Sequence, residues 1–349
     1  MTIRKHNPWE TSSDISALMP LGTRNVSLFA HASGLSRHQG DPVVIFFTGA
    51  GAPAAGYIKV QQHISSFVRT LFYDRAGYDR STLPSSNVES LTAQDAAKDL
   101  GALLKQIDVL PPYILVGHSY GGILLREFLH LQLKEHHPTD PTEVIAGVVL
   151  YDTGTELEYA FFPRLPSADL LAVSNDIDWE VLTKLKAESG MTDEEWSDAM
   201  EAGQRTREKV AQREDTHGSA RVLAEKMQLE RHIYKGGNLA VIRCNSARDY
   251  QMMYDEGVRI GGGTKEERAG ARKFIHEWGM HNFPMAKVQG ELVGDQGNTL
   301  HQELPHWGHD SVFRKPELVG DVVEWVLHKL DDGKKEREMG HGLSIRAGD

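Results

Sequence analysis

One short segment constrains the fold of this chain more than any other. The sequence Gly117-His118-Ser119-Tyr120-Gly121 fits the pattern G-x-S-x-G, directly follows the apolar run 113–116 and precedes a helix-prone stretch at 123–133. A strand, a sharp turn and a helix in that order form the setting of a nucleophile elbow, whose strained turn presents a serine hydroxyl above a sheet edge. Glycines suit this turn because side chains there would clash. The alternative is an ordinary glycine-rich turn before a helix.

Apolar runs and helical patterns alternate around this segment. Runs with the composition of strands buried on both faces lie at 43–47, 68–73, 113–116 and 144–151. Helical spacing at 91–107 and 123–133 separates some of them. This alternation predicts an α/β fold with a doubly wound, mostly parallel sheet flanked by helices.

The pattern changes after residue 154. Residues 155–235 are charged and helix-prone and hold no strand-like run, whereas strand-like runs return at 239–244 and 299–304. The sequence therefore predicts a core made of residues 25–154 and 236–331, interrupted by a helical cap at 155–235. Residues 332–349 are predicted to form a polar C-terminal tail.

A serine nucleophile needs a base and an acid that orients it. His309 follows the last predicted strand and comes after a flexible glycine, so we favour it as the base over His306. Two aspartates follow strands in the Ser–Asp–His chain order: Asp152 directly follows one strand, and Asp249 lies five residues beyond another. We favour Asp152 because a residue at a strand end is held more rigidly. Asp249 remains the alternative acid.

Acyl transfer also needs backbone donors for an oxyanion. One is expected from the amide of Tyr120, which follows the nucleophile. The other is expected from the small-residue loop after the run 43–47, with Ala50 as first choice and Gly51 as second. Phe161 and Phe162 are the predicted apolar lining of a substrate pocket, although packing inside the cap is the simpler explanation for such residues.

Composition excludes some function classes. The 349 residues carry a net charge of -11, which disfavours nucleic acid and anionic membranes as partners. No apolar stretch approaches the roughly 20 residues of a membrane span, and the N-terminus lacks a secretory pattern, so a cytoplasmic protein is expected. The lone Cys244 permits no intramolecular disulfide. The oligomeric state stays open.

No metal or cofactor is expected. His301, His306 and His309 cluster near the C-terminal end, but no carboxylate or cysteine completes a metal site there. The expected partner is a small-molecule acyl substrate.

Five segments in order resemble the α/β-hydrolase superfamily over roughly residues 25 to 330. They are FFTGAG, DRAGYDRS, GHSYGG, VVLYD and GHDSVFRKPELV. The resemblance implies an eight-stranded, mostly parallel sheet, a cap between strands six and seven, no cofactor, Ser119 as nucleophile and His309 as base. Residues 238–268 resemble a branch of fungal-type α/β hydrolases. The chain departs from the common pattern at Thr48, where many members have histidine, and at Asp79, where glycine is common.

The resulting hypothesis is a serine hydrolase that cleaves an ester, lactone or thioester through an acyl-enzyme. An acyltransferase or macrolactone-forming cyclase would use the same triad, and a non-catalytic ligand-binding homologue would keep only the fold. A lyase or a cofactor-free oxygen-using enzyme of the same fold also stays open. Serine at position 119 argues against epoxide hydrolases and haloalkane dehalogenases, because those members use aspartate there.

Overall fold

An eight-stranded, mostly parallel sheet organises the protein. The computed structural model describes residues 7–22, 24–84 and 90–346. The strand order is β1-β2-β4-β3-β5-β6-β7-β8. Their bounds are β1 Asp14–Leu21, β2 Val26–Ser33, β3 Val43–Phe47, β4 Thr70–Tyr73, β5 Tyr113–His118, β6 Ile145–Tyr151, β7 Asn238–Cys244 and β8 Asn298–Leu304. The predicted sheet class is confirmed.

The N-terminal edge of the sheet is antiparallel. Strand β1 pairs antiparallel with β2, and β2 pairs antiparallel with β4, whereas every pairing from β4 to β8 is parallel. Strand β1 lies before residue 25, where the predicted core began. Its residues alternate between exposed and half-buried, so it lacks the continuous apolar run that marks β3 or β5.

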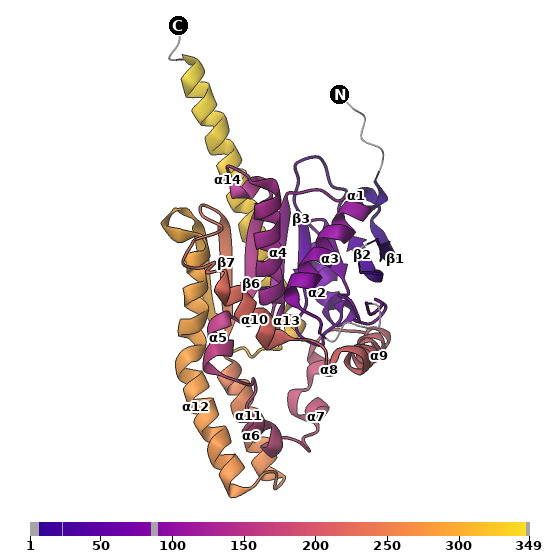
Figure 1. Ribbon diagram of the computed structural model, residues 1–349, viewed down its shortest axis with the longest axis vertical. Helices are drawn as coiled ribbons and strands as arrows, with labels where there is room; N and C mark the ends of the chain where they lie inside the picture. Colours follow the sequence, from indigo (N-terminus) through magenta and orange to yellow (C-terminus); the bar gives the residue numbers. More distant parts are fainter. Residues whose placement is uncertain (1–6, 23, 85–89, 347–349) are drawn as a thin grey trace.

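Helices cover both faces of the sheet. The buried side chains of α3 Ala93–Gln106 and α4 Gly121–His136 join one apolar core, and those of α2 Ile58–Ser65 and α14 Pro316–Arg346 join the other. Helix α14 extends well beyond the sheet (Figure 1) and through most of the range 332–349. Short elements complete the body: α1 Pro8–Thr11, α13 Ser311–Arg314 and the 3₁₀ helices η1 Ala54–Tyr57, η2 Pro141–Glu143, η3 Gln289–Leu292 and η4 Gly294–Gln296.

A helical layer lies beyond the carboxyl ends of the parallel strands (Figure 1). Six of its helices connect β6 to β7: α5 Glu156–Phe161, α6 Ala168–Val173, α7 Trp179–Thr183, α8 Leu185–Glu188, α9 Asp193–Val210 and α10 Thr216–Glu225. Two more, α11 Ser246–Arg259 and α12 Lys265–Val288, connect β7 to β8. A third apolar cluster joins the two connections, with Leu170 and Val173 of α6 packed among Phe274 and Trp278 of α12. The layer over the sheet edge is therefore built from two separate stretches of chain.

Among the described residues, no helix has the combined length and apolar character that crossing a bilayer requires.

Candidate active site

Ser119 occupies a strained turn between β5 and α4. Its φ is +56°, in the left-handed region that residues with side chains seldom adopt. The turn is tightly packed, since a Cβ on Gly121 would lie 2.0 Å from the carbonyl oxygen of Phe47. A Cβ on Gly117 would lie 3.0 Å from the backbone of Gly121. The small residues of the motif are therefore required by the close approach of β3 and α4.

The ring of His309 is held by Asp152. Its Nδ1 lies 2.5 Å from Asp152 Oδ2, and Asp152 Oδ1 accepts a hydrogen bond from the Cys244 amide at 2.9 Å. The Asp152 side chain is only 2% exposed, whereas that of His309 is 43% exposed. The histidine can thus meet a substrate or water while its acid partner stays buried.

Charge around Asp152 keeps the carboxyl ionised. Burial raises the pKa of Asp152. The Arg243 guanidinium, 3.5 Å from Oδ1, and the hydrogen bond with His309 lower it by more, so that the net pKa lies well below its usual range. For His309, the partial loss of solvation lowers the pKa, whereas the hydrogen bond and charge of Asp152 raise it, and the net result lies above the ordinary value. The pair therefore favours a charged imidazolium once the histidine has taken a proton.

Asp249, the alternative acid, contacts the same histidine at a different atom. Its Oδ2 accepts a hydrogen bond from the backbone N–H of His309 at 2.6 Å. A Cβ on Gly308 would lie 1.9 Å from Asp249 Oδ1, so this carboxylate presses directly against the histidine loop. Burial raises the pKa of Asp249 to about 6. Asp249 supports the loop, whereas Asp152 contacts the ring.

The loop after β3 approaches Ser119 closely. A Cβ on Gly49 would lie 3.1 Å from the Ser119 Cβ. The Gly49 amide donates to Tyr57 Oη at 3.1 Å, and the Gly51 amide donates to Tyr78 Oη at 2.8 Å. The backbone amides of Ala50 and Tyr120 have no acceptor within the described part of the chain. The two first-choice oxyanion donors are therefore free of other partners, and Gly51 is engaged.

His118, the residue before the serine, links this loop to the histidine loop. Its Nε2 donates to the carbonyl oxygen of His309 at 3.1 Å, so Nδ1 accepts from the Tyr57 hydroxyl at 2.9 Å. The rings of His118 and His309 stack with centroids 4.5 Å apart. Burial and the charge of His309 lower the pKa of His118 to about 3. His118 therefore stays neutral beside His309.

Ser119 and His309 face a common cavity of about 650 Å³. Ala50, Tyr120 and Asp152 also line it, and much of its remaining wall is apolar or aromatic, formed by Leu165, Leu171, Trp179, Tyr250, Met253 and Trp278. A second cavity of about 440 Å³ shares His309 and Trp179 with the first. His306, the rival base, lines only this second cavity of the two. These volumes suit a small molecule.

The structure does not bring Phe161 and Phe162 to the wall of the 650 Å³ cavity that Ser119 and His309 line. Phe161 is 64% exposed and stacks on His281. Phe162 is buried against Phe274 and Trp278 of α12. Helix α5 ends here and directs both rings toward the second helical connection. The next segment, with Leu165 and Leu171, lines the cavity in their place.

Sequence reasoning missed two charged residues beside Asp152. Arg243 lies within β7, is 3% exposed, and donates to Glu158 Oε1 of α5 at 2.6 Å. The sequence did hold a signal for Arg243, since it is a charged residue inside the apolar run 239–244. A buried charge needs a partner, so an acidic group nearby could have been expected. The partner Glu158 is distant in sequence and gave no comparable signal. Among the described residues, no group of three or more His, Cys, Asp or Glu is placed to hold a metal ion.

Comparison with known proteins finds a matching family and relatives with different names. A profile of the family described as "Alpha/beta hydrolase family" matches residues 44–322. A Gibberella zeae protein named "AB hydrolase superfamily protein" is 28% identical over 92% of this chain and 98% of its own length. A Hormonema carpetanum protein named "Probable transporter efuK" is 31% identical over 95% of this chain. This chain spans only 45% of the length of that second relative.

Solved structures share the fold at low sequence identity. One, from work on carboxylesterases of Nitrososphaera gargenis, has a TM-score of 0.50 and 13% identity, covering 91% of this chain and 100% of that one. Another, a bacterial membrane phospholipase A, has a TM-score of 0.56 and 13% identity, covering 91% of this chain and 87% of that one.

Proposed function

Because this chain belongs to the alpha/beta hydrolase family, we propose that it is a serine hydrolase that cleaves an ester, lactone or thioester through an acyl-enzyme. The observation that carries the proposal is the pairing of His309 Nδ1 with Asp152 Oδ2 at 2.5 Å, beside a serine in a strained elbow that lines the same cavity. A serine hydroxyl becomes a useful nucleophile when a positioned base takes its proton.

The proposed reaction gives each of these residues a role. Ser119 Oγ attacks the acyl carbon while His309 accepts its proton, and Asp152 holds the ring and stabilises the imidazolium. The amides of Ala50 and Tyr120 donate to the oxyanion of the tetrahedral intermediate. His309 then protonates the leaving group, and a second cycle with water releases the acid and regenerates Ser119.

The cavities support a substrate class. The largely apolar wall of the 650 Å³ cavity suits a medium-sized apolar acyl group. The 440 Å³ cavity adjoins it at His309, the side on which the leaving group receives its proton, so we assign the leaving group to it. Since His309 is 43% exposed, water reaches the base, and we propose hydrolysis ahead of acyl transfer or cyclisation.

The test is labelling with a fluorophosphonate, which reacts with activated serines. We expect stoichiometric labelling of the purified protein at Ser119, identified by peptide mass spectrometry, and loss of labelling and of ester turnover in Ser119→Ala. A heat-denatured sample is the negative control. Turnover retained in Ser119→Ala would refute the mechanism. An unlabelled wild-type protein would favour a ligand-binding role.

A further inference from the structure

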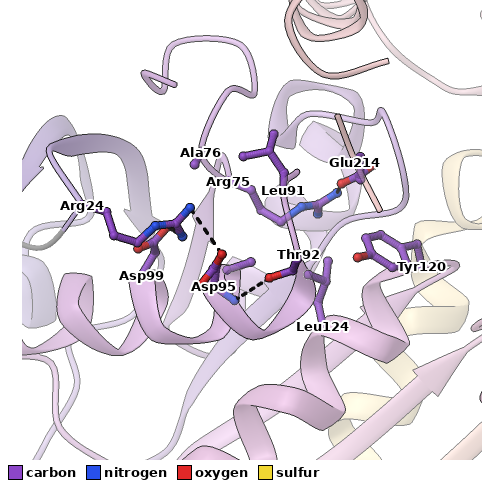
Figure 2. A pocket seen from close by; sticks show the side chains of 11 residues that line it. Arg24, Arg75, Ala76, Leu91, Thr92, Asp95, Asp99, Tyr120, Leu124 and Glu214 are labelled. Carbon is purple, nitrogen blue, oxygen red and sulfur yellow. Dashed lines mark hydrogen bonds and ion pairs between the residues drawn. The ribbon is translucent and has the colours of Figure 1, made fainter. Parts of the chain in front are cut away.

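A glutamate from the helical layer lies beside the oxyanion loop, here defined as residues 48–51. Glu214 belongs to the segment between α9 and α10. That segment is tied to the segment before α3 by two backbone bonds, from the Leu91 amide to Arg213 O at 2.7 Å and from the Asp215 amide to Leu91 O at 3.0 Å. Figure 2 shows Glu214 facing Arg75, with Leu91 and Tyr120 nearby. The backbone bonds to Leu91 therefore fix the position of Glu214 relative to the segment before α3.

Arg75, from the loop after β4, connects this glutamate to the oxyanion loop. Its Nη1 donates to Thr48 O at 2.8 Å, and its Nη2 donates to Gly49 O at 3.0 Å. The same Nη2 lies 2.9 Å from Glu214 Oε1. One guanidinium thus holds two successive carbonyls of the loop and is itself held by the glutamate.

Glu214 also contacts the loop directly. Its Oε2 accepts a hydrogen bond from the Gly51 amide at 3.3 Å, while its Oε1 accepts one from the Tyr78 hydroxyl at 2.6 Å. The side chains of Arg75 and Glu214 are 5% and 10% exposed. In such a poorly solvated site the ion pair is weakly screened, and removing one partner leaves the other buried and uncompensated.

These contacts surround Ala50 on both sides. Thr48 and Gly49 are held through their carbonyls, and Gly51 is held through its amide. The amide of Ala50 itself has no acceptor within the described residues, and Ala50 lines the 650 Å³ cavity. An oxyanion donor works only when its position is fixed before the charge develops. The loop therefore depends on an external clamp.

We propose that Glu214 is a positioning residue that, through Arg75, holds the oxyanion loop so that the Ala50 amide faces the developing oxyanion. The inference rests on the proposed function, because it assigns a role within that same site. It follows that the helical layer both covers the site and completes it.

The test compares Glu214→Gln with the matched control Glu156→Gln. Glu156, at the start of α5, forms the same kind of buried pair with Arg126 of α4, at 2.7 Å, with side chains 9% and 0% exposed. Among the described residues, Glu156 forms no hydrogen bond or ion pair with the oxyanion loop, and it does not line the 650 Å³ cavity. Both changes neutralise one carboxylate in a buried pair between a core helix or loop and the helical layer.

The readout is the ratio of kcat/KM for an ester to that for the matching thionoester, together with kcat, KM and the pH profile. Thionoester sulfur accepts hydrogen bonds poorly, so this ratio reports on oxyanion donors and not on overall folding. We expect Glu214→Gln to lower kcat at least about tenfold and to lower the ratio by a similar factor, with KM and the acidic limb of the pH profile unchanged. Glu156→Gln should keep both kcat and the ratio within about twofold of wild type.

Equal losses in both variants would assign Glu214 to general docking of the helical layer and overturn the proposal. A wild-type ratio in Glu214→Gln would overturn it as well. If Glu214→Gln does not fold, Tyr78→Phe removes the hydroxyl that donates to Glu214 Oε1 and accepts from the Gly51 amide, and it should lower the ratio severalfold. An unchanged ratio there also overturns the proposal. Failure of the proposed function looks different, because Ser119→Ala would then keep its turnover.

Discussion

Two buried arginine–glutamate pairs flank Ser119 and act on the site in different ways. Arg243 pairs with Glu158 of α5, and Arg75 pairs with Glu214. Each joins the sheet body to the helical layer. Arg243 Nε lies 3.5 Å from an Asp152 carboxylate oxygen, whereas Arg75 contacts backbone carbonyls of the oxyanion loop. The first pair therefore adjusts the charge balance of the acid and base, and the second fixes the geometry of a loop.

This difference predicts separate experimental signatures. A change at the Arg243 pair should move the pH dependence of catalysis, because it alters the electrostatic field at His309. A change at the Arg75 pair should alter discrimination between esters and thionoesters. The variants below are ordered from the largest expected effect to the smallest.

Asp152→Asn removes the group on which the Arg243 pair acts. We expect kcat to fall by about ten-thousand-fold, because the neutral amide no longer favours the correct tautomer or stabilises the imidazolium. Steady-state kinetics on an activated ester will measure the loss, with circular dichroism as the folding control. A loss of less than about tenfold would mean that another carboxylate is the acid.

Asp249→Asn tests that alternative at the same histidine. Its carboxylate accepts from the His309 backbone amide, so the variant should loosen the loop and lower kcat by about ten- to a hundredfold. The measurement is the same ester assay beside Asp152→Asn. If Asp249→Asn proves the more damaging of the two, the assignment of the acid must be reversed.

Glu158→Gln distinguishes the electrostatic role of the Arg243–Glu158 pair from the positioning role of the Arg75–Glu214 pair. Without the glutamate charge, Arg243 acts more strongly on His309 and disfavours the imidazolium, so the pKa of His309 falls. Catalysis needs the neutral ring, and kcat/KM therefore rises with pH through this pKa. The acidic limb should move to lower pH by up to about one unit, and the ester-to-thionoester ratio should stay constant. An acidic limb that moves upward would contradict this electrostatic account.

Trp179→Ala probes the helical layer as a wall of the cavity. Trp179 of α7 lines both cavities. We expect KM for a bulky apolar ester to rise about fivefold with little change in kcat, and a smaller effect for an acetate ester. A kcat loss shared by both substrates would instead place Trp179 among the groups that organise the site.

Local sequence signals predicted the parts of the site that depend on a few neighbouring residues. The strand–turn–helix around Ser119 was visible because its glycines and the preceding apolar run are adjacent in the chain. Chain order also indicated His309 and Asp152, since loops at the carboxyl ends of parallel strands meet at one edge of the sheet. The position of Phe161 and Phe162 depended on the packing of α5 against α12, more than a hundred residues away, and no local pattern encodes it.

The sequence by itself determined the fold class, the elbow and the set of candidate partners for Ser119, because these depend on local periodicity and on the order of segments along the chain. Only the tertiary structure decided which aspartate contacts the His309 ring and which contacts its backbone, since both lie at the same sheet edge. It also decided that Glu158 and Glu214 lie against Arg243 and Arg75. Such pairs form between distant segments, and burial makes their geometry matter.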